Sequence, residues 1–166
     1  MPTITALRRV IAAPAKRRVR VFASLLMVGG LIGIGSSAVL AYRVAPLRPL
    51  IAVDGAAFIA IFGWTSAVGL RLWRGDPRGT HWAILLYALQ IPSLEVYGFK
   101  YNYFTGLAVL MLYSPSGSPV AFDFGAAMTL MFDGDSRRFV LGVNVIAIAA
   151  CAVIAASGRR KLWMHS

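Results

Sequence analysis

Apolar residues occur in four long runs along the chain, each bounded by charged residues or by turns rich in proline and glycine. The runs cover residues 21–42, 50–70, 82–97 and 139–157. Because a helix of about 20 apolar residues crosses the roughly 30 Å hydrocarbon core of a bilayer, this pattern predicts four transmembrane helices. The third helix is expected to be short, since Pro92 and Glu95 interrupt its outer end.

The segment between the last two runs, residues 98–138, has a different pattern. Aromatic side chains fall on alternate positions over 97–103 and apolar ones over 120–132, with a serine- and proline-rich turn at 114–119. A period of two is typical of strands, so we expect an extracytoplasmic β-hairpin or small antiparallel sheet between the third and fourth helices; a re-entrant helix is the alternative. Four apolar side chains are expected to form one buried strand face: Phe122, Phe124, Met128 and Leu130.

Residues 1–20 form a basic segment before the first span, and Pro14 is expected to interrupt any long helix there. A second interpretation of the first span is a cleaved signal peptide, because residues 39–41 have the small-residue pattern of a cleavage site. The length of the span and its long basic lead favour a retained membrane anchor.

Basic residues lie at one set of alternate ends of the spans. They are Arg8, Arg9, Lys16, Arg17, Arg18, Arg20, Arg71, Arg74, Arg78, Arg159, Arg160 and Lys161. On this side only Asp76 is acidic, whereas acidic and basic residues balance on the other side, so this side carries the whole net charge of +11. By the positive-inside rule, the pattern predicts a multi-pass protein of the bacterial inner (plasma) membrane with both termini in the cytoplasm.

The composition agrees with a single integral membrane domain. Hydrophobic residues make up 58% and charged residues 14% of the 166 positions, outside the usual range of soluble domains. The positive charges flank apolar spans and are not interleaved with aromatic residues on a polar face. We therefore expect anionic lipid headgroups, and not nucleic acid, as their partner.

Residues for catalysis are sparse. The chain contains no phosphate-binding loop, dinucleotide fingerprint, zinc-protease motif or nucleophile elbow. The chain has one cysteine, Cys151, and two histidines, His81 and His165. These are too few for an internal disulfide or for a zinc cluster. The predicted topology also places both histidines away from the outer serines. The sequence therefore predicts no enzyme activity, no cofactor and no metal site.

Small residues in the first span are candidate helix-packing positions. Gly29, Gly33 and Ser37 recur every four residues, which places them in one stripe along a helix. Such a stripe lets another backbone approach closely. The neighbour is expected to be a helix of the same bundle, with a second copy of the chain as the alternative.

Four polar residues are candidate functional or structural positions. Asp54 lies about 6 Å inside the second span, where an ionisable group suggests ion or proton coupling; pairing with an arginine at the same interface is the structural alternative. Glu95 and Lys100 are expected to form an ion pair at the outer surface. Asn144 is expected to hydrogen-bond a neighbouring helix or the sheet.

Three stretches carry a family resemblance: 103–107 (Tyr-Phe-Thr-Gly-Leu), 122–125 (Phe-Asp-Phe-Gly) and 142–147 (Gly-Val-Asn-Val-Ile-Ala). Together they resemble a pattern in small bacterial inner-membrane proteins to which no activity is assigned, over roughly the last third of the chain. The resemblance implies the same layout of helices with an outer hairpin. It transfers no catalytic residue.

The sequence favours a non-enzymatic inner-membrane protein that contacts other membrane proteins or itself, as an accessory or assembly subunit. The alternative is a small oligomeric transporter, or a transporter subunit, that uses Asp54. Four spans are too few for an obvious pathway in one subunit, so the transporter hypothesis requires oligomerisation.

Overall fold

The computed structural model describes residues 4–44, 49–115, 117–132 and 139–162, and within them the side chains of 17–43, 53–115, 117–131 and 139–157. These residues form four helices and one small antiparallel sheet. The helices are α1 (Ile4–Val44), α2 (Pro49–Arg74), α3 (Pro77–Leu89) and α4 (Val145–Leu162). The strands are β1 (Pro92–Val96), β2 (Phe99–Tyr113), β3 (Val120–Phe132) and β4 (Phe139–Asn144).

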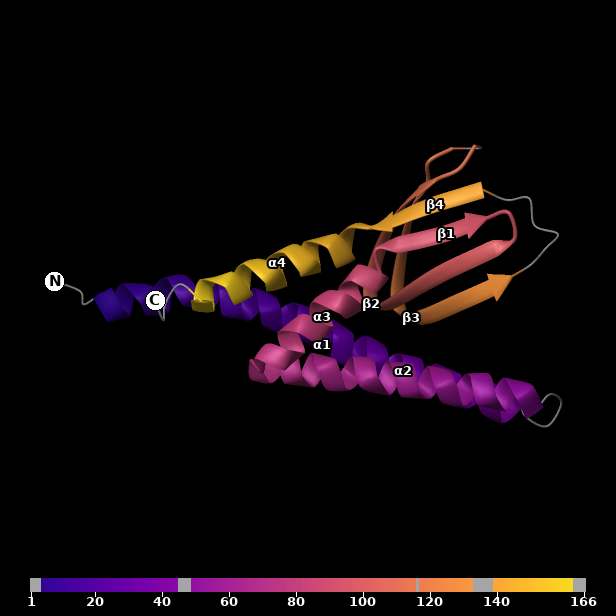
Figure 1. Ribbon diagram of the computed structural model, residues 1–166, viewed down its shortest axis with the longest axis horizontal. Coiled ribbons are helices and arrows are strands. Elements are labelled where there is room, and N and C mark those ends of the chain that lie inside the picture. The colour runs from indigo at the N-terminus through magenta and orange to yellow at the C-terminus, as the bar shows by residue number, and fades with distance from the viewer. Residues whose placement is uncertain (1–3, 45–48, 116, 133–138, 163–166) are drawn as a thin grey trace.

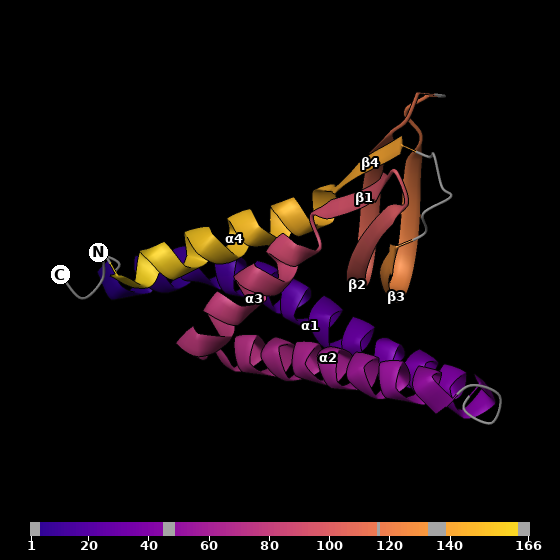
Figure 2. The same ribbon diagram turned by 45° about the vertical axis from the view of Figure 1, so that its right-hand side comes forward.

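Helices α1 and α2 run side by side along the long axis of the molecule (Figure 1). The turned view agrees, and it shows α3 and α4 beside the N-terminal half of α1, with the sheet beside its C-terminal half (Figure 2). The main core lies where the four helices meet the sheet. Its buried members include Ala23, Leu26, Phe62, Val68, Leu86, Tyr87, Tyr103, Ala147 and Ile154.

The chain reverses between α2 and α3 in a compact turn. Gly75 has a positive φ of +79°, and Asp76 caps α3 by accepting a hydrogen bond from the backbone N–H of Arg78 at 2.9 Å. Pro77 occupies the first turn of α3, where a proline costs little because its missing N–H has no helical partner there.

Among the described residues, two helices are long and apolar enough to cross a membrane. The segments are Arg17–Arg43 of α1, with 27 residues, and Val53–Arg74 of α2, with 22 residues. Helix α3 has only 13 residues, and the apolar part of α4 is limited to Val145–Ser157. Four transmembrane helices are therefore not confirmed.

The expected bounds of the third and fourth helices are wrong, and so is the interruption expected at Pro14. The third run, 82–97, leaves the helix after Leu89 and continues into β1, and the fourth run, 139–157, begins with β4. Residues 92–96 and 139–143 pair in antiparallel register, so tertiary pairing makes strands of both segments. The interruption expected at Pro14 is absent, since α1 continues through it; one proline removes one helical hydrogen bond and need not end a helix.

The sheet is partly closed. The strand order is β1-β4-β2-β3, and β1 also pairs with β2. Strand β1 pairs with the start of β2, at 99–101, and β4 pairs with its end, at 110–113. Strands β1 and β4 therefore lie along the edge of β2 that β3 leaves free. Phe104, Ala108 and Leu110 of β2 form a small second core with Ala121 and Ala127 of β3.

The β2–β3 hairpin bends at a pair of glycines. Gly106 of β2 lies opposite Gly125 of β3, and both have a positive φ, +86° and +139°, which other residues rarely adopt. The pair divides the hairpin into a proximal arm (99–105 and 126–132) and a distal arm (107–113 and 120–124). The distal arm turns away from α1 and α2, across the long axis of the molecule (Figures 1 and 2).

Candidate functional site

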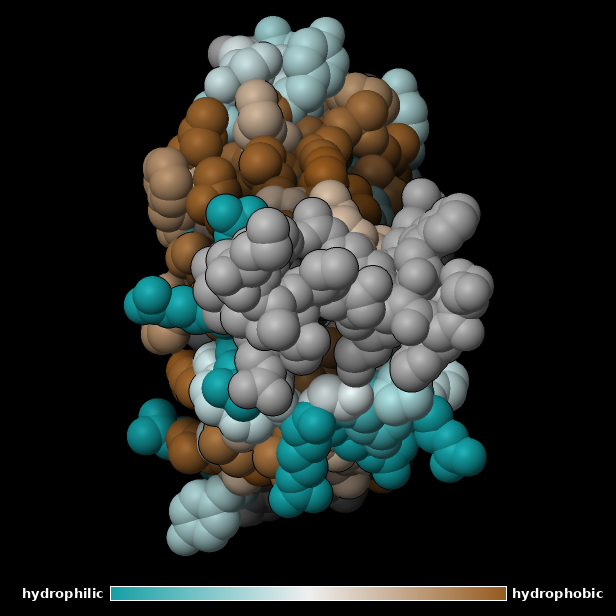
Figure 3. All heavy atoms as spheres, turned by 90° about the vertical axis from the view of Figure 1, so that its left-hand side faces the viewer, coloured by the Kyte–Doolittle hydropathy of each residue, from teal (hydrophilic) through white to brown (hydrophobic). Residues whose placement is uncertain are grey.

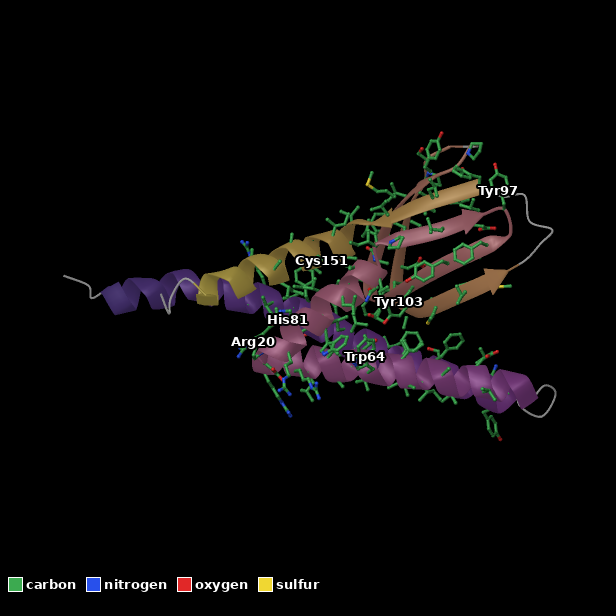
Figure 4. The ribbon with its side chains drawn as sticks, in the orientation of Figure 1. Arg20, Trp64, His81, Tyr97, Tyr103 and Cys151 are labelled. Carbon is green, nitrogen blue, oxygen red and sulfur yellow. The ribbon has the colours of Figure 1, made fainter. Side chains whose placement is uncertain are left out.

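Two tyrosines, the half-buried Tyr101 and the buried Tyr103, attach the proximal arm to the helices. The Tyr101 hydroxyl donates to the carbonyl oxygen of Leu89 at 2.7 Å, and the Tyr103 hydroxyl lies 2.8 Å from Thr65 Oγ1 (Figure 4). Thr65 donates its own hydrogen to the carbonyl of Ile61, so Tyr103 is the donor to Thr65. Burial raises the pKa of both phenols, so both remain protonated donors at neutral pH.

Gln90 and Thr105 make the third attachment, two positions further along β2. Gln90 Nε2 donates to Thr105 Oγ1 at 3.0 Å, and Gln90 Oε1 accepts the backbone N–H of Thr105 at 3.1 Å. Both side chains are buried. The pair fixes the end of α3 against the bend of the hairpin. These three contacts join neutral groups.

Asn144 joins the sheet to α4. Its Oδ1 accepts the N–H of Ile146 at 3.1 Å and of Ala147 at 3.4 Å, which caps the helix, and also the N–H of Val109 in β2 at 3.3 Å. Its own N–H donates to the carbonyl of Ile91 at 2.8 Å. The residue is fully buried. Its side-chain oxygen joins the end of β4 to α4 and to β2, its backbone N–H joins it to the segment after α3, and its Nδ2 has no hydrogen-bond partner among the described residues.

Strand β3 is an edge strand of the sheet: residues of α1 and α2, among them Gly33 and Phe62, lie near its middle at 126–128, whereas Phe122 and Leu130 toward its two ends are exposed. Among the described residues it pairs with β2 alone, over 13 residue positions from 120 to 132. Its only charged side chain is that of Asp123, and it contains no proline or lysine. Soluble proteins usually protect a sheet edge with such residues, because an exposed edge can pair with another strand. The β3 edge is therefore a candidate interaction site.

One face of the distal arm is apolar and uncovered. Its cross-strand rows place Leu107 opposite Phe124, Val109 opposite Phe122 and Met111 opposite Val120. We call this surface the distal face; it also includes Leu141 and Val143 of β4, which pair with 113 and 111. Phe122 is 74% exposed and Phe124 67% exposed.

The expected buried face on β3 is thus wrong in most of its members. Phe122, Phe124, Met128 and Leu130 do lie on one face of the strand, but only Met128 packs against the main core, and Leu130 is 54% exposed. The bend at Gly125 is the reason, because it directs the distal half of that face away from the helices.

Exposed arginines gather around the α2–α3 turn and the part of α1 that passes it (Figure 4). They come from three helices: Arg17, Arg18 and Arg20 of α1, Arg71 and Arg74 of α2, and Arg78 of α3. The Arg20 guanidinium carbon lies 5.4 Å from the centre of a Trp73 ring, a cation–π contact. We call this the basic end. Seen from the side of the two termini, hydrophilic side chains occupy the lower part of the surface, and a hydrophobic surface lies below the hairpin tip (Figure 3).

The stripe of small residues on α1 lies in contacts within the chain. A Cβ on Gly29 would collide with the backbone of Gly106, and one on Gly33 would collide with the ring of Phe62. Ser37 is buried, and its carbonyl oxygen lies 3.8 Å from the position of a Cβ on Gly55 in α2. Because the residues of the stripe are small, both α2 and the sheet pack closely against α1.

Of the three charged candidates from the sequence, Glu95 and Lys100 lie together and Asp54 has no ion pair among the described residues. Asp54 is exposed on α2, and two of the arginines expected at the same interface, Arg48 and Arg137, lie outside the described residues. Glu95 and Lys100 face each other across β1 and β2 with 3.6 Å between their charged atoms. Such an exposed pair contributes little stability. No observation on the described residues places Asp54 in a polar pathway.

The sequence reasoning missed the residues that position the sheet. Thr65, Gln90, Tyr101, Tyr103 and Thr105 were not identified as partners of one another. The alternation of Tyr101, Tyr103 and Thr105 indicated a shared face, and Gln90 is an isolated polar residue at the end of an apolar helix. Neither signal identified a partner, because the contacts cross between elements.

The described side chains include no group of three or more histidine, cysteine, aspartate or glutamate residues that could hold a metal ion. Comparison of the chain with known protein families, with curated proteins and with solved structures finds no match. The open β3 edge, the distal face and the basic end are therefore the features from which a function has to be inferred.

Proposed function

We propose that the protein is a multi-pass protein of a bacterial inner membrane, with both termini and the α2–α3 turn in the cytoplasm and the sheet on the outer side. The basic end supports this orientation, because arginines flanking membrane spans favour the cytoplasmic side. At 1.5 Å per residue, α1 rises about 35 Å from Arg20 to Arg43, close to the roughly 30 Å of a hydrocarbon core. Ala23 and Leu26 of α1 belong to the main core, which supports a retained anchor.

The proposed role is non-enzymatic: the protein acts as an accessory or assembly subunit through contacts with another protein. The main support for this role is the unpaired edge of β3. Main-chain groups along such an edge can bind an extended segment of a partner by adding a strand to the sheet, and alternate side chains then give specificity. Near the hydrocarbon region this pairing gains importance, because an unpaired backbone group costs several kcal/mol there.

The orientation can be tested with reporter fusions. A reporter active only in the cytoplasm should be active after Gly75 and at the C-terminus, and inactive after Gly117, where the hairpin turn lies on the outer side. A reporter active only outside should give the reverse pattern. Equal activity after Gly75 and Gly117 would contradict the proposed orientation.

The β3 edge can be tested by photo-cross-linking in intact cells. A photoreactive amino acid at Met131, an exposed position of β3, should give an adduct with a partner chain. The same amino acid at Tyr97, which is exposed in the β1–β2 turn away from this edge, should not give that adduct. Mass spectrometry of the adduct distinguishes a second copy of the chain from another protein.

A charge placed on the edge provides the decisive control. Leu130→Lys should abolish the Met131 adduct, because lysine on an edge strand disfavours pairing with another strand. Tyr97→Lys should leave the adduct unchanged. If the adduct persists in the Leu130→Lys protein at normal expression, the β3 edge is not the contact site.

A further inference from the structure

Two arginines of the basic end come together where α2 turns into α3. Arg71 lies in the last turn of α2 and Arg78 in the first turn of α3, and both are exposed. A Cβ on Gly79 would lie 2.8 Å from the Cβ of Arg71, so the two helices touch at this point. The backbone N–H of Asp76 also donates to the carbonyl oxygen of Arg71 at 3.0 Å. The backbone therefore holds the two arginines next to each other.

The two guanidinium groups suit a phosphate. Among the described residues the ion pair that forms is between Lys100 and Glu95, so neither arginine is paired with a carboxylate. Asp76, between them in the sequence, uses its carboxylate to accept the N–H of Arg78 and cap α3. Like charges at such a short separation repel one another, and a bound anion relieves the repulsion. The planar fork of N–H donors on a guanidinium matches the oxygens of a phosphate.

Two tryptophans lie beside these arginines. Trp64 precedes Arg71 by two helical turns on the same side of α2, and Trp82 follows Arg78 by one turn on the same side of α3. The two indole rings meet edge to face, with 5.3 Å between their centroids (Figure 4). Trp64 remains 40% exposed and Trp82 42% exposed. Tryptophan is enriched at the level of the lipid headgroups, so an exposed pair beside two arginines indicates contact with lipid.

Exposed leucines continue this surface along α3. Leu85 and Leu89 are each 44% exposed, and their spacing from Trp82 places all three on one side of the helix. This side of α3 thus carries an arginine, an indole and two leucines in order. A phospholipid presents its phosphate, glycerol backbone and acyl chains in the same order. A soluble phosphate or a nucleic acid would contact the arginines but leave the leucines uncovered.

We propose that Arg71 and Arg78 bind the phosphate of an anionic phospholipid, whose glycerol backbone and acyl chains lie along the two tryptophans and the leucines of α3. We call this the headgroup site. The other arginines of the basic end repel the ammonium group of a zwitterionic headgroup, which favours an anionic lipid such as phosphatidylglycerol. The inference rests on the membrane location proposed above, and it assigns the attraction for anionic lipid to one site between α2 and α3.

Native mass spectrometry of the full-length protein in a neutral detergent can test the proposal. The protein is titrated with phosphatidylglycerol or with phosphatidylethanolamine of the same acyl chains. We expect one phosphatidylglycerol per chain to bind first, in preference to phosphatidylethanolamine. Replacing Arg71 and Arg78 together with glutamine should weaken this binding about tenfold or more, because each arginine near an anionic headgroup contributes to the affinity.

The matched control replaces Arg17 and Arg18 of α1 with glutamine, which removes the same charge from two other exposed positions of the basic end. This control should bind phosphatidylglycerol as the parent does. Size-exclusion chromatography checks that both double variants elute as the parent. If the first one does not, Arg78→Gln alone, at the exposed start of α3, should weaken binding about fivefold.

The outcomes separate the headgroup site from the membrane location. Equal weakening in the two double variants would overturn the site, because the lipid would then bind through overall charge. Displacement of the lipid by an equal concentration of inorganic phosphate or of an RNA oligonucleotide would overturn the assignment to lipid. A cytoplasmic reporter that is active after Gly75, without a preference for phosphatidylglycerol, overturns the headgroup site alone. An inactive one overturns the orientation and leaves the titration to decide the site.

Discussion

Replacing Gly106 with alanine is expected to destabilise the folded protein by about 2 to 6 kcal/mol. The added methyl group would lie 2.7 Å from the carbonyl oxygen of Leu25 in α1, and overpacking of this kind costs about 1 to 3 kcal/mol. The residue also has φ of +86°, and a strained backbone conformation costs a further 1 to 3 kcal/mol, roughly. The backbones of α1 and β2 would have to separate, which would loosen the sheet from the helices.

The matched control is Gly35→Ala in α1, where no atom lies within 4 Å of the added Cβ. Alanine in a helix interior is favoured over glycine by up to about 1 kcal/mol, so this variant should equal or exceed the parent in stability. Thermal stability of the detergent-purified proteins, followed by fluorescence-detected size-exclusion chromatography, measures both. A Gly106→Ala protein as stable as the Gly35→Ala protein would refute the close contact between α1 and β2.

The presence of strands between two helical regions could be predicted from the sequence. Alternating aromatic residues over 97–103 and alternating apolar residues over 120–132 indicated strands, because a period of two places every second side chain on one face. This alternation is a local property of each strand, so it indicates a strand whatever the strand packs against.

The bounds of the third and fourth helices could not be predicted in the same way. Residues 92–96 and 139–144 continue the apolar runs beside them, and a short run of this kind fits a strand or a helix equally well. The two segments become strands because they pair with each other and with β2. The pairing of β1 with β4 joins positions more than 40 residues apart, which periodicity does not reveal.

The exposure of the distal arm depends on a bend that the sequence indicates only in part. Gly106 and Gly125 are visible in the sequence as single glycines within strands, which are typical of a bend or a close backbone approach. Their position opposite each other follows only from the register of β2 and β3. Phe122 and Phe124 fall beyond this bend, so their burial could not be judged from alternation alone.

Replacing Asn144 with leucine is expected to cost about 2 to 4 kcal/mol of stability. Leucine has a similar size but no acceptor, so α4 loses its cap, at about 0.5 to 2 kcal/mol. The buried N–H of Val109 loses its partner as well, at about 1 to 3 kcal/mol. The thermal stability of the purified variant, measured against the parent, gives the total loss.

Asn144→Ser separates the two contributions to this loss. A serine oxygen can still cap α4 through the N–H groups of Ile146 and Ala147, but it is too short to keep the bond to Val109 in β2 as well. We therefore expect the serine variant to lie between the parent and the leucine variant. Full stability with serine would mean that Asn144 acts only as a helix cap. Full stability with leucine would contradict both roles, because three backbone donors would then be losing their acceptor at no cost.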